Sequence, residues 1–376
     1  MMRYCRLCIL PDSRPGITLD DSGVCTACRG HEDKERNIDW EARERALREL
    51  VAEVKAVGHD YDCVVPVSGG KDSWYQVHIC LELGLKVLAV TWRTPARTEI
   101  GQRNLDNLIA GLGVDHIDYT INPDVERRFM KAAYETKAAT AIPMHMALFA
   151  IPIRLATQLG VPLIVWGENP QLEFGGSDAD RLATDLDPAW VRRHGVTNQT
   201  SVDDWIGKNG LTAADLAAYQ LPPDEAFREA TRSIFLGSYI KWNSFDNAEL
   251  AARRGFSSGK GRPRTGTWGF ADIDCDFISL HHFLKWHKFG LTRAFDNLSV
   301  MIRHRVIDRA DAIQTLSETG LQVPHEDIAA FCRFVDEPES WFWDIAERFR
   351  NTDVWARQAD GWHIPGFLIE DWDWTQ

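Results

Sequence analysis

The chain has 376 residues, of which 44% are hydrophobic and 26% are charged, a balance typical of a globular protein. Since one domain takes roughly 150 residues, this length predicts two or three domains. The 55 acidic residues outnumber the 42 basic ones and give a formal charge of −13, so we expect no nucleic-acid partner, because binding to the phosphate backbone depends on Lys and Arg.

We expect a cytoplasmic protein without a membrane span. The longest apolar stretch, residues 141–153, contains Pro143, His145 and Pro152 and is shorter than the roughly 18 residues that a spanning helix needs. The N-terminal residues lack the apolar segment of a signal peptide. In the reducing cytoplasm the cysteines stay free of disulfides.

Residues 1–35 contain two pairs of cysteines. Cys5 and Cys8 form one CxxC motif, and Cys25 and Cys28 form a second one after sixteen intervening residues. Two such turns can present four thiolates to one metal ion with no coordination position left open, so the spacing predicts a structural zinc module. An iron–sulfur cluster and a redox pair of cysteines remain alternatives.

Strands and helices alternate over residues 36–200. Apolar runs predict strands at residues 62–67, 86–92, 116–120 and 161–166, and helical periodicity predicts helices at residues 40–57, 74–83, 100–112 and within 129–159. This alternation is typical of an α/β domain with a doubly wound parallel sheet. The binding crevice of such a domain lies at the ends of the strands.

Residues 201–376 are predicted to be mostly helical. Helices are expected at residues 213–219, 223–234, 246–254, 277–289, 309–319 and 327–334. Between them, residues 255–269 are rich in Gly and basic side chains, which predicts a mobile loop. Six of the fifteen tryptophans fall between residues 341 and 374, either as a core or interface cluster or as a platform on which a sugar stacks.

A glycine-containing turn joins the first predicted strand to its helix. It comprises Ser68, Gly69, Gly70, Lys71, Asp72 and Ser73. Backbone N–H groups and the positive end of a helix converge above such a turn, which predicts a phosphate-binding loop. A Walker A loop would need Gly at position 65 and Ser or Thr at position 72, where this chain has Val65 and Asp72. A carboxylate beside phosphates fits a role for Asp72 in holding Mg2+.

The SGGKDS loop between a strand and a helix resembles the PP-loop ATP pyrophosphatase superfamily. This resemblance implies an adenine nucleotide alpha hydrolase-like domain that activates a carbonyl oxygen with AMP and releases pyrophosphate from ATP. It also implies that the segment around Thr91 and Trp92 meets the adenosine.

Four further segments resemble the N-acetyl sugar amidotransferase family: residues 166–176, 237–244, 272–276 and 288–296. The resemblance implies that the chain converts an acetamido group of a sugar into an acetamidino group in the biosynthesis of bacterial surface polysaccharide, such as the O-antigen of lipopolysaccharide, or of nonulosonic acid. Residues 201–376 would then contact the substrate or a partner.

The same resemblance implies roles for several side chains. Glu168, Asn169 and Glu173 follow a predicted strand and are expected to bind sugar hydroxyls or a second metal, although an ordinary polar loop would look the same. The remaining candidates are Gly175 and Gly176 for close backbone approach, and Lys241, Lys288 and Arg293 for phosphate or a sugar carboxylate. With Lys71 and Asp72, the side chains of Lys241 and Arg293 form the expected catalytic set.

His281, His282 and His287 are interpreted as core or surface histidines rather than as metal ligands, because their spacing does not stack all three on one helix face.

The source of ammonia is expected to be a separate glutaminase subunit or solution. Cys63, Cys80, Cys275 and Cys332 all lie outside a Gly-x-Cys-x-Gly elbow, so the sequence shows no glutaminase nucleophile. Two other functions stay open: an ATP-dependent tRNA thiolase of the same superfamily, and a non-enzymatic nucleotide-binding scaffold.

Overall fold

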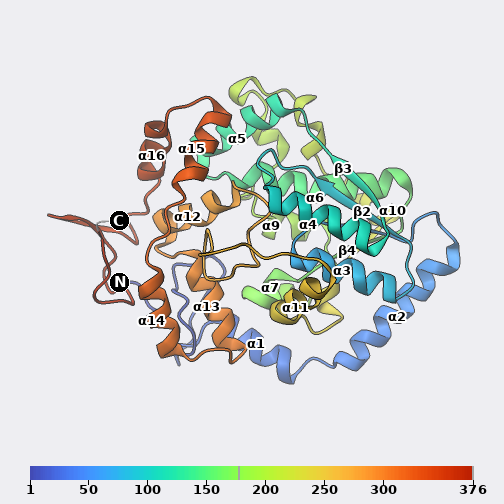
Figure 1. Ribbon diagram of the computed structural model, residues 1–376, viewed down its shortest axis with the longest axis horizontal. Helices are drawn as coiled ribbons and strands as arrows, with labels where there is room; N and C mark the ends of the chain where they lie inside the picture. Colours follow the sequence, from blue (N-terminus) through green and yellow to red (C-terminus); the bar gives the residue numbers. More distant parts are fainter. Residues whose placement is uncertain (177, 375–376) are drawn as a thin grey trace.

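The computed structural model describes all residues except 177, 375 and 376 (Figure 1). A parallel sheet lies at its centre, with five strands in the order β3-β2-β1-β4-β5. The strands are β1 (Cys63–Pro66), β2 (Val87–Trp92), β3 (Asp115–Tyr119), β4 (Leu163–Trp166) and β5 (Arg232–Phe235). The strand order reverses between β1 and β4, and ligands of such sheets bind beyond the carboxyl ends of the strands at that point.

Helices cover both faces of this sheet. They are α2 (Trp40–Val57), α3 (Lys71–Glu82), α4 (Glu99–Leu112), α5 (Pro123–Lys137) and α6 (Ala141–Leu159). Val65 belongs to the core formed with α2, α3 and α4, whereas its neighbour Val64 belongs to the core formed with α5 and α6. Because both faces are buried, the central strands consist of continuous apolar runs. The doubly wound α/β fold expected from the sequence is confirmed.

Two predictions within this half need correction. The helical region at residues 129–159 is two helices, because Ala138 adopts a left-handed conformation (φ 43°) between α5 and α6. The predicted helix at residues 223–234 is wrong at its end: α10 (Asp224–Ala230) stops at an extended Thr231, and β5 follows. The side chains of β5 from Ser233 to Phe235 are buried, so pairing with β4 overrides the helical pattern.

Short elements connect β4 to β5. They are α7 (Pro170–Phe174), α8 (Asp178–Leu182), α9 (Pro188–His194) and three 3-10 turns at Val202–Trp205, Lys208–Gly210 and Asp215–Tyr219. The last of these stands where a helix was predicted at residues 213–219.

The rest of the chain is mostly helical, as expected. After a 3-10 turn at Leu236–Ser238 come α11 (Ser244–Arg254), α12 (Ile278–Phe289), α13 (Arg293–Arg303), α14 (Arg309–Thr319), α15 (His325–Val335), α16 (Glu339–Arg348) and a hairpin of β6 (Ala356–Gln358) and β7 (Gly361–His363). Helices α13 and α16 were not predicted from the sequence.

The N-terminal segment packs on this helical region rather than standing alone. All four N-terminal cysteines share one buried core with Trp286, Phe295 and Trp372. Arg14 forms an ion pair with the buried Asp296 of α13 (2.6 Å). Figure 1 accordingly shows both chain ends on the left, beside α12 to α14. Helix α1 (Thr26–Arg36) leads from this core toward the sheet.

Helix α6 is the one helix in the described part of the chain that is long and apolar enough to cross a membrane by length and composition. In the structure 61% of its apolar window is buried inside the protein, and its side chains contribute to the core beneath the sheet. It therefore acts here as a core helix.

The packing of α7 against α1 can be tested at a glycine. A Cβ on Gly175 (φ +99°) would lie 3.0 Å from the backbone nitrogen of Ala27, whereas a Cβ on Gly58 (φ +78°) would meet nothing within 4 Å. We expect Gly58→Ala to destabilise the fold by about 1 kcal/mol through its backbone conformation alone. Gly175→Ala should cost about 1–3 kcal/mol more, measured by urea unfolding. Equal losses in both variants would contradict this packing role.

Candidate active site

The SGGKDS loop lies at the carboxyl end of β1, beside the point where the strand order reverses. The backbone N–H of Ser68 donates to the hydroxyl of Ser73 (3.0 Å), and the N–H of Gly70 donates to the hydroxyl of Ser68 (3.3 Å). A Cβ on Gly69 (φ +90°) would lie 2.7 Å from the nitrogen of Leu105, so α4 leaves room only for glycine. The loop hydroxyls thus hold its backbone in shape, and the N-terminus of α3, whose first N–H groups have no partner within the helix, opens to the crevice.

Opposite charges meet at the first turn of α3. Lys71 is buried and forms an ion pair with Asp72, and its ammonium lies 5.7 Å from the centre of the Phe270 ring. The amide of Asn247 donates to the other oxygen of the Asp72 carboxylate (3.4 Å). Asn247 belongs to α11 and Phe270 to the loop before α12, so the C-terminal half closes over the phosphate loop.

Glu168 follows the end of β4 and lies near Lys71 and Asp72 of this loop. Burial, together with the nearby carboxylate of Asp72, raises the pKa of Glu168 to about 8, while Lys71 and Arg293 act in the opposite direction. Its carboxyl group makes no hydrogen bond to any residue that the structure describes. Glu168 therefore retains its capacity to bind a cation or to exchange a proton near neutral pH.

Arg293 reaches the same site from the start of α13. Its guanidinium donates to Asp272 (2.9 Å), and the other oxygen of that carboxylate lies 3.4 Å from His282 Nε2. Although burial alone would raise the pKa of Asp272, Arg293 and His282 hold it well below its usual range. Asp296 lies 3.7 Å from Arg293 on the other side. Arg293 is thus paired with two carboxylates, and its charge acts on the pKa of Glu168.

Asp274 is a site residue that the sequence analysis did not single out. Burial raises the pKa of this carboxyl group, and the hydroxyl of Ser68 partly offsets the effect. The backbone of Asp274 docks on the N-terminus of α4: its carbonyl accepts from Thr98 N (3.2 Å), and a Cβ on Gly101 would lie 2.7 Å from its Cα. The sequence feature that could have identified it is the group of three aspartates within residues 272–276.

Thr91 and Trp92 end β2 beside the loop. The hydroxyl of Thr91 donates to the carbonyl of Val67 (2.7 Å) and lies 2.8 Å from His116 Nε2. The indole N–H of Trp92 donates to the carboxyl group of Glu126 (2.8 Å). Both polar groups therefore have partners within the chain, and an adenosine contact by these residues stays a prediction.

Other candidates from the loop after β4 have structural partners. Asn169 is 1% exposed, caps α7 by accepting from Gln171 N (2.9 Å), and donates to carbonyl oxygens of residues 180–183. Glu173 forms an ion pair with the buried Lys34 of α1. Gly175 lies against α1, and a Cβ on Gly176 would collide with the side chain of Gln171.

Two of the three expected cations have partners elsewhere in the chain. Lys241 is half-exposed and pairs with Glu35 of α1 (2.6 Å). Lys288 donates to the carbonyl of Lys137 at the end of α5 (2.6 Å), and burial lowers its pKa to about 8. Of the three, only Arg293 contributes to the electrostatics of Glu168. The structure therefore brings together the phosphate loop, Glu168 and Arg293.

The four N-terminal cysteines form a compact cluster apart from the phosphate loop. All four are buried, and their sulfur atoms lie within 4.8 Å of one another. The Cys5–Cys28 and Cys8–Cys25 sulfur distances are 3.9 Å and 3.6 Å. Four thiolates bound tetrahedrally at about 2.3 Å from one zinc ion would be about 3.8 Å apart. The donor set and its spacing therefore fit a closed metal site.

Comparison with known proteins adds one assignment. Residues 264–367 match the family described as LPS biosynthesis protein WbpG-like, C-terminal domain. The matched segment includes Asp272, Asp274 and Arg293. A search of curated proteins found no match.

Solved structures similar to this chain include two synthetases. One is the NMN synthetase of Francisella tularensis, with 15% identity and a TM-score of 0.27 over 58% of this chain and 94% of that chain. Another is the NH3-dependent NAD synthetase of Campylobacter jejuni, with 16% identity and a TM-score of 0.28 over 58% of this chain and 97% of that chain.

The buried carboxyl group of Glu126, which accepts a hydrogen bond from Trp92, should make the stability of the fold depend on pH. Glu126 is 2% exposed, and burial raises its pKa to about 7 despite the Trp92 hydrogen bond, whereas the ordinary value is 4.5. Between pH 4.5 and pH 7, the Glu126 carboxyl group therefore keeps its proton in the folded state and loses it in the unfolded state. Stability from this group is fully present below pH 4.5 and is lost as the pH rises through 7.

We expect Glu126→Gln to remove this pH dependence, because the glutamine oxygen still accepts from Trp92 and cannot ionise. Relative to the wild type, the variant should gain about 1–3 kcal/mol of unfolding free energy between pH 5 and pH 8, measured by urea titration at each pH. Glu225→Gln, which changes an exposed carboxylate of α10, serves as the control. Parallel pH curves for wild type and Glu126→Gln would refute the assignment.

Proposed function

We propose that this chain is an ATP-dependent N-acetyl sugar amidotransferase that makes an acetamidino sugar for bacterial surface polysaccharide, such as lipopolysaccharide O-antigen, or for nonulosonic acid. The observation that carries the proposal is that Glu168, beside the phosphate loop, is within electrostatic range of Lys71, Asp72 and Arg293, and Arg293 lies in the segment that matches the WbpG-like family. That family is described by its role in LPS biosynthesis, and the loop motif resembles that of enzymes that form AMP and pyrophosphate. We place the reaction in the cytoplasm, where ATP is available.

The proposed reaction has two steps. The acetamido oxygen attacks the α-phosphorus of ATP, the bond to pyrophosphate breaks, and an O-adenylated imidate forms. Ammonia then adds to the imidate carbon, loses a proton, and displaces AMP with the original oxygen. Sugar, ATP and ammonia thus give acetamidino sugar, AMP and pyrophosphate. Adenylation is needed because an amide oxygen is otherwise a poor leaving group.

The residues of the loop fit the first step. The N-terminus of α3, whose first N–H groups have no partner within the helix, can bind the departing pyrophosphate, and Lys71 offsets its charge. The carboxylate of Asp72, together with that of Glu168, whose pKa it helps to raise, provides the hard oxygen ligands that Mg2+ prefers. When bound, Mg2+ would neutralise charge on the phosphates.

Glu168 and Arg293 fit the second step. Once pyrophosphate has left together with its cation, Glu168, whose pKa is about 8 in the cation-free site, can take up the proton that ammonia loses. Arg293, oriented by Asp272, is placed to stabilise negative charge on the AMP moiety or on a sugar carboxylate. We propose that the cysteine cluster holds a structural zinc ion, since a site closed by four thiolates leaves no position for a substrate.

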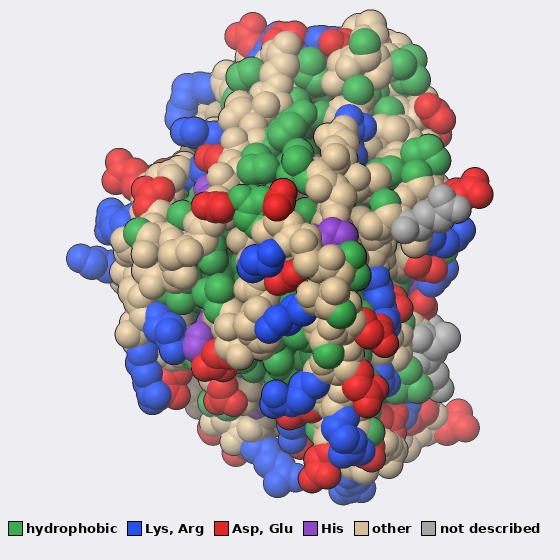
Figure 2. Space-filling view, turned by 90° about the vertical axis from the view of Figure 1, so that its right-hand side faces the viewer, with side chains coloured by type: hydrophobic (Ala, Val, Ile, Leu, Met, Phe, Trp, Pro, Cys, Tyr) green, Lys and Arg blue, Asp and Glu red, His purple; other side chains and the backbone are tan. Residues whose placement is uncertain are grey.

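The structure favours this reaction over tRNA thiolation. A thiolase needs a reactive cysteine, but the cysteines outside the cluster are buried, and burial raises the pKa of Cys275 to about 12 and of Cys332 to about 11. On the face shown in Figure 2, the described basic side chains are interspersed with acidic ones and form no continuous basic track for a nucleic-acid backbone.

The central test measures AMP and pyrophosphate with ATP, Mg2+ and ammonium over a panel of N-acetylated sugars. We expect one sugar to yield a product lighter by about one mass unit, as oxygen is replaced by NH. Asp72→Ala should lower the rate by about 100-fold or more. The exposed Asp311→Ala on α14 should leave it unchanged. AMP formation stimulated by bulk tRNA, with every sugar inactive, would refute the proposal in favour of the thiolase.

A second prediction concerns the source of ammonia. Since the described cysteines are all buried, we propose that a separate glutaminase subunit supplies it in the cell. The purified chain should therefore turn over with ammonium and show no turnover with glutamine alone. Turnover of the single chain that depends on glutamine would overturn the need for a partner while leaving the amidine chemistry intact.

A further inference from the structure

The four N-terminal cysteines bring more negative charge than one divalent metal ion neutralises. All four are buried, and they form a single cluster of sulfur atoms. With Zn2+ bound by four thiolates, two negative charges would stay uncompensated. A buried charge is costly unless its surroundings pair with it or donate hydrogen bonds to it. The residues around the cluster therefore have to supply N–H donors or positive charge.

Backbone N–H groups supply donors to two of the four sulfur atoms. The N–H groups of Cys8 and Cys25 donate to the sulfur of Cys5 (3.4 Å and 3.3 Å), and the N–H of Cys28 donates to the sulfur of Cys25 (3.4 Å). In the part of the chain that the structure describes, no N–H group donates to the sulfur of Cys8 or Cys28. These two thiolates therefore lack the compensation that the other two receive.

Arg303, the last residue of α13, has a buried donor that no described residue uses. Its side chain is 9% exposed, and its Nη2 donates to the carbonyl of Glu173 (3.1 Å), whereas its Nη1 is buried without a hydrogen-bond partner. Sulfur contacts with Cys25 and Cys28 lower the pKa of the Cys8 thiol, and the charge of Arg303 acts in the same direction. An unused guanidinium donor thus belongs to a side chain within electrostatic range of a cysteine that lacks an N–H donor.

Arg309, the first residue of α14, contacts the first CxxC turn directly. Its Nε donates to the carbonyl of Cys8 (3.0 Å), and its Nη2 donates to the carbonyl of Cys5 (3.5 Å). Side chains of α13 and α14 share one buried core with the four cysteines, and Figure 1 shows both helices beside the N-terminal segment. The guanidinium of Arg309 therefore fixes the backbone of two metal-ligand candidates from outside residues 1–35.

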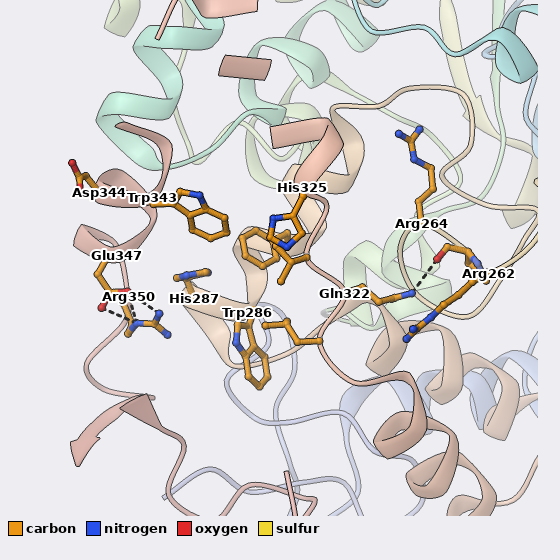
Figure 3. Close-up of a pocket in the computed structure, with 14 residues that line it drawn as sticks. Arg262, Arg264, Trp286, His287, Gln322, His325, Trp343, Asp344, Glu347 and Arg350 are labelled. Carbon is orange, nitrogen blue, oxygen red and sulfur yellow. Dashed lines mark hydrogen bonds and ion pairs between the residues drawn. The ribbon is translucent and has the colours of Figure 1, made fainter. Parts of the chain in front are cut away.

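Neither of these arginines has a carboxylate partner among the described residues. This distinguishes them from Arg350, in the wall of a cavity of about 990 Å³ between α12 and α16, which pairs with Glu347 (2.7 Å) as Figure 3 shows. Buried and half-buried charges normally have a partner of opposite charge. The positive charges of Arg303 and Arg309 are therefore available to the cysteine cluster.

We propose that Arg303 and Arg309 complete the metal site from α13 and α14 as positioning residues. The guanidinium of Arg303 offsets the charge of the metal-bound thiolates, chiefly that of Cys8, and Arg309 holds the first CxxC turn in the shape that binds the metal. Metal binding then stabilises the docking of residues 1–35 on the helical half. The inference rests on zinc in the cysteine cluster and is independent of the amidine chemistry.

The zinc affinity of the full chain tests the proposal. We expect the wild type to hold about one zinc ion per chain, and competition with a chromophoric chelator gives its affinity. Arg303→Gln and Arg309→Gln should each weaken that affinity by about tenfold or more. Arg303→Lys, which keeps the charge, should recover part of the loss. Arg305→Gln, which removes an exposed cation just after the end of α13, should leave the affinity unchanged.

Cobalt substitution separates the effect of charge from that of packing. When Co2+ replaces zinc, its absorption includes charge transfer from the thiolates, and the energy of this band depends on the charge near the sulfur atoms. Loss of a nearby cation should shift the band to longer wavelength in Arg303→Gln. The band should stay in place in Arg305→Gln.

Four results would overturn the proposal. Unchanged zinc affinity in both glutamine variants would show that neither arginine acts on the site. Equal losses in Arg303→Gln and Arg303→Lys, with no shift of the cobalt band, would assign Arg303 to packing alone. A loss of the same size in Arg305→Gln would indicate a general effect of net charge. Absence of metal from the wild type would refute the zinc assignment itself and leave the test with sugars and ATP unaffected.

Arg309→Gln protects the test against a failure to fold. Its side chain is half-buried rather than buried, so this variant remains informative if Arg303→Gln does not fold.

Discussion

The buried ion pair between Arg293 and Asp272 ties Arg293 to the segment that docks on the sheet half of the protein. Both residues lie in the segment that matches the WbpG-like family, and the neighbouring Asp274 docks on the N-terminus of α4. Removing either partner would leave an uncompensated charge in a dry environment, which is far more costly than the pair itself. The position of Arg293, and with it its effect on the pKa of Glu168, therefore depends on this pair.

The sheet and the C-terminal half contribute different chemistry. The sheet supplies the fixed geometry of the phosphate loop, since β1 and α3 are held by cores on both faces. The C-terminal half supplies Arg293, Asp272 and Asp274 and is itself braced by the N-terminal cysteine cluster, which shares its core. A structural metal there would act on the active site indirectly, by holding Arg14 against Asp296 beside Arg293.

Continuous sequence patterns predicted much of this architecture. The strands β1 to β4 and the phosphate loop follow from local periodicity and from one short motif. Strand β5 was missed because its four residues become a strand through pairing with β4, which no local pattern encodes. Asn169 and Glu173 are polar residues at the end of a strand, which is the pattern of a ligand site. In the structure, however, Asn169 caps helix α7 and Glu173 pairs with Lys34, and the sequence pattern does not distinguish these structural roles from ligand binding. Asp274 reaches the loop only through tertiary docking.

The charge balance of the active site follows from these contacts. Asp72, Glu168, Asp272 and Asp274 surround the loop, while Lys71 and Arg293 are the cations coupled to Glu168. The carboxylates outnumber these cations, and a nucleotide triphosphate brings further negative charge. Under the proposed function, the phosphates would therefore have to bind together with a divalent cation, for which Asp72 and an ionised Glu168 offer ligands. The raised pKa of Glu168 is the expected property of such a site before the cation is bound, because two nearby carboxylates resist ionising together.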